Sequence, residues 1–242
     1  MAALPSDGGR PLPALIVFAR EPVAGRVKSR LIARLGAQAA ARLADAFIID
    51  ALAKAGSFRG CKLVIAGSAP GSVRNSPYFN RIARRFGTEL IDQGGGDLGR
   101  RMARVLAAYA EGTGAVLFGT DTPSLPRAFI RQSIDALREA PVVVAPALDG
   151  GYYLVAVRGR VPDIFDGIEW GGSRVMGQTL RRLHGLKVRY RLGRWWYDID
   201  RPADLDFLAA DLARGLCGGS GVSACPATVR LMRELGLLRL RP

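Results

Sequence analysis

The sequence predicts an α/β protein: a single-domain, three-layer sandwich in which a mostly parallel, mixed sheet is covered by helices on both faces. Two observations lead to this prediction. Short apolar runs alternate with helical stretches from residue 14 to residue 145, a pattern typical of strands buried on both faces and joined by helices. The 242 residues, 49% hydrophobic and 23% charged, are enough for one large domain with a substantial core.

Strands and helices are expected in turn along this first part. The expected strands are rich in β-branched residues and are Ala14–Ala19, Lys62–Ala66, Thr88–Ile91, Ala115–Gly119 and Val142–Ala145. The expected helices carry apolar residues at helical spacing. They are Gly36–Lys54, a short helix near Arg81, a helix through Met102, Val105 and Leu106, and Pro126–Glu139.

The pattern changes after Pro146. A strand at Tyr152–Val157 follows the previous strand after a short turn, which predicts antiparallel pairing and therefore a mixed sheet. A helix over Ser173–Leu183, a strand over Lys187–Leu192 and a helix over Asp204–Leu212 complete the domain, expected at residues 14–214. Residues 1–13 are expected to be a flexible tail. Residues 215–242 are expected to be an extension with a glycine-rich linker (Gly215–Gly221) and an amphipathic helix (Thr228–Leu238).

The net charge of +14 comes from 35 Lys and Arg against 21 Asp and Glu. A basic protein of this kind can bind nucleic acid. Here, however, the arginines are spread evenly, with no run longer than two and few aromatic residues between them. We therefore disfavour a nucleic-acid partner. A GC-rich genome explains the many arginines, and a small anionic substrate such as a nucleotide explains a locally basic site.

No apolar run approaches the roughly 18 residues that a membrane span requires. The first residues lack the basic and apolar regions of a secretory signal. Three scattered cysteines are too few for a disulfide framework or a zinc site. We expect a cytoplasmic protein without a membrane span.

The first candidate site is a basic loop, Ala19–Leu31, directly after the first strand. Its cations surround Gly25 and precede a helix; they are Arg20, Arg26, Lys28 and Arg30. Such a loop suits phosphate, because Lys and Arg charges add to free backbone N–H groups and a helix N-terminus. It is neither a Walker A loop nor GxGxxG, and the alternative interpretation is a solvated basic loop.

Carboxylates follow three further apolar runs. Asp121 ends the strand before Thr122-Pro123 and is suited either to Mg²⁺ or to capping a turn. Asp149 precedes two glycines, which permit close approach of a ligand or simply form a tight turn.

In the segment Trp195–Leu205, Asp198 and Asp200 alternate on one face, so either could be a second carboxylate for the same metal. Asp204, in contrast, is expected to be a helix N-terminal residue only. His184 is the one histidine of the sequence, and no GxSxG motif accompanies it, which argues against a Ser-His-Asp hydrolase.

Five motifs occur together in this chain: FARxPxxGxVKSRL, QxxGDLGxRM, GxDTPSL, DGGYYL and YDIDxPxDL. In this order they resemble the nucleotide-diphospho-sugar transferase superfamily, which has the GT-A fold. More closely, they resemble the bacterial rSAM/selenodomain-associated transferase family. The resemblance covers roughly Ala14–Leu212. The first loop departs from the superfamily in lacking the LAAGxSxRMG pattern of sugar nucleotidyltransferases.

The resemblance implies roles for particular residues. Lys28 and Arg30 would contact the β and γ phosphates of a nucleotide, within a loop that includes Arg20 and Gly25. Asp121 and Asp200, with Asp198 as the alternative to Asp200, would hold Mg²⁺ or Mn²⁺. The loop that contacts the base would include Gln93, Gly95, Asp97 and Gly99. The acceptor pocket would be lined by Asp149, Gly150, Gly151, Tyr152, Trp170 and Ser173.

Two reactions are compatible with this resemblance. In nucleotidyl transfer, a small anionic or phosphorylated acceptor attacks a nucleoside triphosphate and pyrophosphate leaves; Lys28, Arg30, Asp121 and Asp149 are the candidate catalytic residues. In glycosyl transfer, the donor is a nucleotide sugar and Asp149 is a candidate base. Because Thr122-Pro123 follows Asp121, the DxD pair of many glycosyltransferases is missing, and nucleotidyl transfer is favoured. A non-catalytic nucleotide-binding protein remains a third hypothesis.

Overall fold

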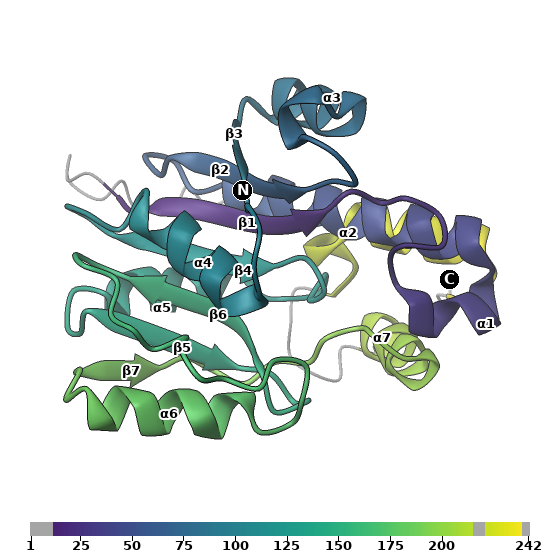
Figure 1. Cartoon of the computed structure of the whole chain (residues 1–242). Coiled ribbons are helices and arrows are strands. Elements are labelled where there is room, and N and C mark those ends of the chain that lie inside the picture. Colours follow the sequence, from purple (N-terminus) through teal and green to yellow (C-terminus); the bar gives the residue numbers. More distant parts are fainter. Residues whose placement is uncertain (1–11, 215–220, 239–242) are drawn as a thin grey trace.

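A seven-stranded sheet forms the centre of the protein (Figure 1). The computed structural model describes residues 12–214 and 221–238. In chain order the strands are β1 (Ala14–Arg20), β2 (Leu63–Ser68), β3 (Glu89–Asp92), β4 (Ala115–Gly119), β5 (Val142–Pro146), β6 (Tyr152–Val157) and β7 (Tyr190–Leu192). They lie side by side in the order β3-β2-β1-β4-β6-β5-β7. Only β6 runs antiparallel to its neighbours β4 and β5, so the predicted mixed, mostly parallel sheet is confirmed.

Helices connect the strands. They are α1 (Ile32–Leu35), α2 (Ala37–Gly56), α3 (Pro77–Phe86), α4 (Leu98–Ala107), α5 (Arg127–Ala136), α6 (Val175–Gly185), α7 (Pro202–Arg214) and α8 (Pro226–Glu234). Three short 3₁₀ helices, η1 (Ser29–Leu31), η2 (Val73–Asn75) and η3 (Gly221–Ala224), complete the elements that the structure describes. None of the helices in residues 12–214 and 221–238 is long and apolar enough to cross a membrane.

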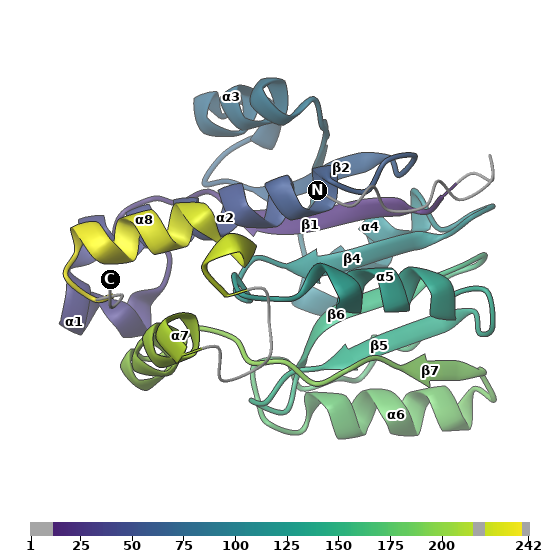
Figure 2. The ribbon, with the colours of Figure 1, turned by 180° about the vertical axis from the view of Figure 1, so that it is seen from behind.

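The five central strands of the sheet are buried on both faces, as their continuous apolar runs predict. Side chains alternate along a strand, so Leu15 and Val17 of β1 point into one core while Ala14 and Ile16 point into the other. The first core lies under α2, α5, α7 and α8. The second lies under α4 and α6. Figure 1 shows the face covered by α4, and Figure 2 shows the face covered by α2, α5 and α8.

The C-terminal helix α8 packs against α2 of the same chain, where Figure 2 shows them side by side. The backbone N–H groups of Ala227 and Thr228 donate to the Asp50 carboxylate of α2, at 2.9 and 2.8 Å. The buried Met232 belongs to the first core. The expected linker at 215–220 and the expected tail at 1–11 lie outside the described residues.

Three expected elements are shorter in the structure, and one of them is the C-terminal helix, expected over Thr228–Leu238 but observed over Pro226–Glu234. The helix expected over Pro126–Glu139 ends at Ala136, because the N–H groups of the next residues form tight turns ahead of Pro141. The strand expected from Lys187 begins only at Tyr190. Lys187 takes a left-handed conformation (φ 54°), and the Val188 N–H donates back to Leu183 O, so both residues terminate α6 and are not available to the sheet.

Candidate active site

A pocket of about 600 Å³ opens at the carboxyl ends of β1 and β4. Ligands of open α/β sheets bind at this edge, and the volume is that of a small-molecule site. Twelve of the predicted site residues line it: Arg20, Arg26, Lys28, Arg30, Gln93, Asp121, Asp149, Gly151, Tyr152, Trp170, Asp198 and Asp200. The other predicted residues, Gly25, Gly95, Asp97, Gly99, Gly150 and Ser173, are not part of its lining.

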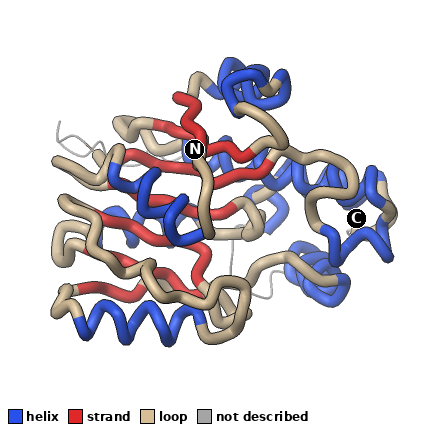
Figure 3. The backbone as a smooth tube through the Cα atoms, in the orientation of Figure 1, coloured by secondary structure: helices blue, strands red, loops and turns tan. Residues whose placement is uncertain are grey.

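Lys28 lies at the end of the long loop after β1, drawn in tan in Figure 3. Its side chain is 7% exposed, and the ammonium lies 2.7 Å from Asp121 Oδ1 and 2.9 Å from Asp200 Oδ1. It also donates to Ile199 O at 2.6 Å. Burial alone would lower the pKa of Lys28, but the two carboxylates outweigh burial and raise the pKa above its ordinary value. Lys28 is therefore charged and paired with the protein's own acids, and its contact with phosphate stays a prediction.

The turn that carries Asp121 is held from two sides. The ammonium of Lys54, on α2, donates to Pro123 O at 2.9 Å. The Ile199 N–H donates to Asp121 O at 2.9 Å, which joins the end of β4 to the segment that carries Asp200. This backbone contact explains why two carboxylates 79 positions apart in the sequence share one lysine.

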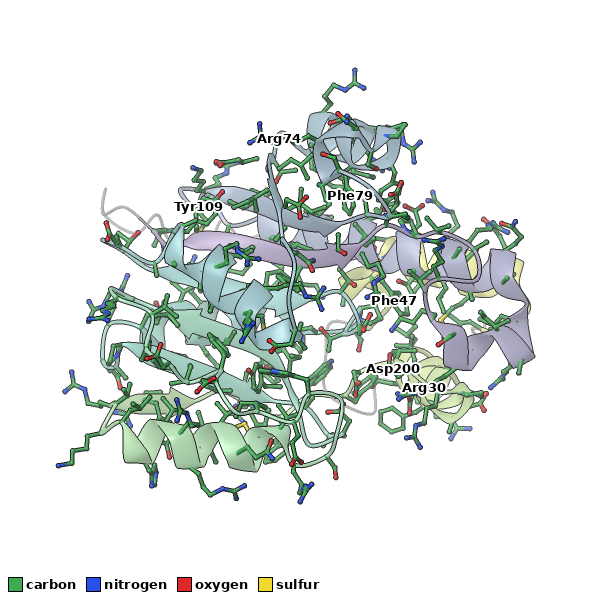
Figure 4. All side chains as sticks on the ribbon, viewed as in Figure 1. Arg30, Phe47, Arg74, Phe79, Tyr109 and Asp200 are labelled. Atoms are coloured by element: carbon green, nitrogen blue, oxygen red, sulfur yellow. The ribbon has the colours of Figure 1, made fainter. Side chains whose placement is uncertain are left out.

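Asp200 contacts a second cation of the basic loop. Its Oδ2 lies 3.6 Å from Arg30 Nη1, and Figure 4 shows the two side chains beside each other. Asp204 serves the backbone instead, since its carboxylate accepts from the N–H groups of Asp200 and Arg201, at 2.9 and 2.6 Å. The prediction that Asp204 is a helix N-terminal residue is confirmed, and this cap also fixes the backbone of Asp200.

Four carboxylates gather at this end of the pocket: Asp121, Asp149, Asp198 and Asp200. Burial, followed by the charges of Asp149, Asp200 and Asp121, raises the pKa of Asp198 to about 6. In the part of the chain that the structure describes, no three His, Cys, Asp or Glu side chains are grouped so as to hold a metal ion. Magnesium, however, commonly takes one or two protein carboxylates and completes its shell with water and substrate phosphate. Asp121 and Asp200 fit that pattern, and a cation there would compete with Lys28 for the same oxygens.

The glycine-rich segment after β3 is built mainly by contacts within the protein. Gln93 is 2% exposed, and its Nε2 donates to Ala19 O at 3.0 Å and to Ala66 O at 2.9 Å. The Asp97 carboxylate accepts from the Arg100 N–H and caps α4. At Gly99 a Cβ atom would lie 2.7 Å from the Trp170 ring, so this glycine permits α4 to pack closely. Contact of the segment with a base stays a prediction.

Sequence reasoning missed Arg101, which lines the pocket from the first turn of α4. Its Nη1 donates to Gln93 Oε1 at 3.0 Å. The signal was present, because Arg101 follows the glycine-rich segment within one helical turn and is adjacent to the buried Met102. That position places a side chain at the border between core and pocket.

The segment expected to bind an acceptor is fixed by close backbone contacts. Gly151 N–H donates to Asp149 Oδ1 at 2.8 Å, and the Gly150 carbonyl accepts from Met176 N at 2.8 Å. Gly150 has a φ of 91°, and a Cβ atom there would lie 2.1 Å from Ser173 O. Gly150 therefore has a structural reason to be glycine, while Asp149 and Gly151 face the pocket.

Two aromatic residues form the wall beside this turn. The rings of Tyr152 and Trp170 meet edge to face, with centroids 6.1 Å apart, and both line the pocket. The Tyr152 hydroxyl is buried. His184 takes no part, since its Nε2 lies 2.8 Å from the Tyr190 hydroxyl at the far end of α6.

Among the solved structures to which the chain is similar is one that it matches over almost its whole length. That structure is a "putative nucleotide-diphospho-sugar transferase" from Desulfovibrio desulfuricans G20, with 26% identity and a TM-score of 0.75 over 92% of this chain and 97% of the other. The fold is therefore that of nucleotide-diphospho-sugar transferases.

Two further structures are more distant. The 2-C-methyl-D-erythritol 4-phosphate cytidylyltransferase of Thermus thermophilus is 16% identical, with a TM-score of 0.47 over 84% of this chain and 99% of the other. Rv0371c of Mycobacterium tuberculosis H37Rv is 20% identical, with a TM-score of 0.45 over 82% and 97%. No curated protein matches the chain.

A family model matches residues 49–172, just over half of the chain. The matched region includes the glycine-rich segment, the turn of Asp121, the turn of Asp149 and Trp170. The chain therefore belongs to the family described as "Uncharacterized protein conserved in bacteria (DUF2064)".

Proposed function

We propose that this protein is a nucleotide-handling transferase that works with a divalent cation, and that it catalyses nucleotidyl transfer from a nucleoside triphosphate to a small anionic acceptor. One observation carries the proposal: the buried ammonium of Lys28 lies between Asp121 and Asp200 in the pocket at the carboxyl ends of β1 and β4. The similarity to the Desulfovibrio protein named as a nucleotide-diphospho-sugar transferase supports the use of a nucleotide substrate.

The proposed reaction requires positioning and charge neutralisation more than covalent work by the protein. An oxygen of the acceptor forms a bond to the α-phosphorus, and the bond from that phosphorus to pyrophosphate breaks. A divalent cation, when bound at Asp121 and Asp200, supplies positive charge to the phosphate oxygens. Lys28 orients the two carboxylates, and Arg30 is placed beside them to neutralise charge on the leaving pyrophosphate.

Glycosyl transfer is the second candidate, and the name of the Desulfovibrio protein favours it. In that reaction Asp149 would take the proton of the acceptor hydroxyl. Its carboxylate faces the pocket and is fixed by the Gly151 N–H. The donor then is a nucleotide sugar, and a nucleoside diphosphate leaves.

Thermal-shift measurements separate these candidates. The four nucleoside triphosphates, their diphosphates and common nucleotide sugars are tested, each with and without Mg²⁺. Nucleotidyl transfer predicts that one triphosphate raises the melting temperature only with Mg²⁺, by roughly 5–10 °C at a hundredfold excess over the dissociation constant. A shift with nucleotide sugars and diphosphates but no triphosphate would replace nucleotidyl by glycosyl transfer. No shift with any nucleotide would refute a nucleotide-handling protein.

A matched pair of variants links the shift to the site. Asp121→Asn removes a carboxylate charge from the pocket, and the Mg²⁺-dependent part of the shift should disappear because the cation loses a ligand. Asp135→Asn on α5 is the control, since its side chain is 48% exposed, as is that of Asp121, and is paired with an arginine outside the pocket. If both variants keep the Mg²⁺-dependent shift, the metal assignment is wrong.

A further inference from the structure

A second group of charged side chains lines the pocket, opposite in sign to the four carboxylates. Arg20 is the last residue of β1, and Arg101 lies in the first turn of α4; both line the pocket. Burial, and then the positive charge of Arg20, lower the pKa of Arg101. Both positive charges therefore belong to the lining of one pocket.

Arg101 is held in place by the core beneath it. Its Nη1 donates to Gln93 Oε1 at 3.0 Å and its Nε to Asp97 O at 3.4 Å. Gln93 is buried, and its own amide is anchored to carbonyls at the ends of β1 and β2. The guanidinium is consequently an oriented group, in contrast to that of a freely moving surface arginine.

Within residues 12–214 and 221–238, neither Arg20 nor Arg101 forms an ion pair with a carboxylate. Asp97 offsets part of the charge on Arg101, but its carboxylate caps α4 through the Arg100 N–H. Arginine has five hydrogen-bond donors in each side chain, and Arg101 uses only two of its nitrogens on Gln93 and Asp97, so donors of both side chains remain for a ligand.

We propose that Arg20 and Arg101 form a subsite for an oxyanion, a phosphate or a carboxylate, separate from the carboxylates of Asp121 and Asp200. Guanidinium groups bind such anions through paired, charge-assisted hydrogen bonds. This subsite adds detail to the proposed function. It rests on that function, because it assumes that the substrates bind in this pocket. The oxyanion belongs either to the acceptor or to the nucleotide, and the two guanidinium groups would bind it through the same hydrogen bonds in either case.

Isothermal titration with inorganic phosphate, and separately with the nucleotide found by thermal shift and its nucleoside, tests the proposal. Arg101→Gln and Arg20→Gln should each weaken phosphate binding at least tenfold. Arg101→Lys should weaken phosphate binding less than Arg101→Gln, because lysine keeps the positive charge. Arg100→Gln is the control: it removes the same charge from the neighbouring position on α4, which is exposed and outside the pocket. The Arg20 side chain is exposed and has no hydrogen bond to any described residue, so its replacement tests the subsite even if the Arg101 variants fold poorly.

The source of the oxyanion follows from the nucleotide titrations. If it belongs to the acceptor, phosphate and nucleotide bind together and Arg101→Gln leaves nucleotide affinity unchanged. If it belongs to the nucleotide, phosphate competes with nucleotide and the variant weakens nucleotide but not nucleoside. Equal phosphate binding by the Arg101, Arg20 and Arg100 variants would overturn the subsite. An equal loss for nucleoside and nucleotide would also overturn it, by indicating a contact with the base.

These results are distinguishable from a failure of the proposed function. Phosphate binding that depends on Arg101, in a protein that binds no nucleotide, would keep the subsite and refute the nucleotide-handling transferase. Nucleotide binding that requires Asp121, together with phosphate binding that is the same in the Arg20, Arg101 and Arg100 variants, would keep the transferase and refute the subsite.

Discussion

Replacing Lys54 by methionine should make the protein more stable at neutral pH. Lys54 is 6% exposed on α2, beside Asp50 and Cys225. Burial lowers its pKa to about 8, against the opposing effects of its neighbours Cys225 and Asp50. At about 1.4 kcal/mol per pH unit, the difference from the ordinary value of 10.5 means that the buried charge costs about 3 kcal/mol at pH 7.

The Lys54→Met variant removes this cost but also loses two favourable interactions. Methionine has a similar length without the charge, but it loses the hydrogen bond to Pro123 O, which contributes about 1 kcal/mol. It also removes the positive charge that lowers the pKa of Asp50, a carboxyl whose pKa burial raises. The net increase in the free energy of unfolding at pH 7 should therefore be about 1–2 kcal/mol.

The sign of the pH dependence follows from the protons that each state binds. Between pH 8 and 10.5 the unfolded wild type keeps the lysine proton and the folded protein has lost it, so wild-type stability rises with pH through Lys54. The advantage of Lys54→Met should then shrink steadily and be lost by about pH 10. Effects of the Cys225 thiol, whose pKa burial raises to about 12, are present in both proteins and largely cancel in the difference.

Urea denaturation at pH 7, 8, 9 and 10 measures this difference. Lys62→Met is the matched control, because Lys62 is exposed and paired with Glu89, and its replacement should change stability by less than about 1 kcal/mol at pH 7 and 8. A variant Lys54→Met that is no more stable than wild type at pH 7, or whose advantage is the same at pH 10, would refute the reasoning.

Two further changes test contacts that shape the fold around the site. Gly150→Ala should destabilise the protein by about 2–4 kcal/mol in urea denaturation, since a Cβ atom would overlap a backbone carbonyl; Gly159→Ala, with a similar φ but open space, should cost only about 1–2 kcal/mol. Equal costs would contradict the close approach. Asp50→Ala should expose the amides of α8 to hydrogen exchange, because it removes three hydrogen bonds at the start of that helix; unchanged protection would show that side-chain packing alone holds α8.

The fold was predictable because most strands of this sheet are buried on both faces. A continuous apolar run marks such a strand without ambiguity when turn residues flank it, and β4 and β6 have the predicted bounds. The ends of α5 and β7 were not predictable from periodicity. Lys187 could extend a strand by its composition, but the termination of α6 gives it a left-handed backbone, and only the three-dimensional arrangement decides between the two.

The sequence predicted which strand ends and loops would form the candidate site, but not the contacts between their side chains. Strand topology brings Asp121 to the same edge as the loop of Lys28, and the alternation of Asp198 and Asp200 made the second carboxylate foreseeable. That one ammonium joins both carboxylates depends on the path of a loop without repetitive structure. Arg101 was missed because its helix has an amphipathic pattern that explains an arginine equally well as a solvated residue.

The two groups of charges in the pocket together limit what it can bind. Of the four carboxylates, Asp121 and Asp200 share Lys28 and Asp200 also faces Arg30, and the excess negative charge of the group is relieved by a small cation. Arg20 and Arg101 carry charge that no described acid neutralises through an ion pair, and it is relieved by an oxyanion. A neutral ligand satisfies neither group, and a simple anion is repelled by the carboxylates. A phosphorylated substrate that arrives with a divalent cation satisfies both, which is why the distribution of charge supports a nucleotide-handling transferase more strongly than any one residue does.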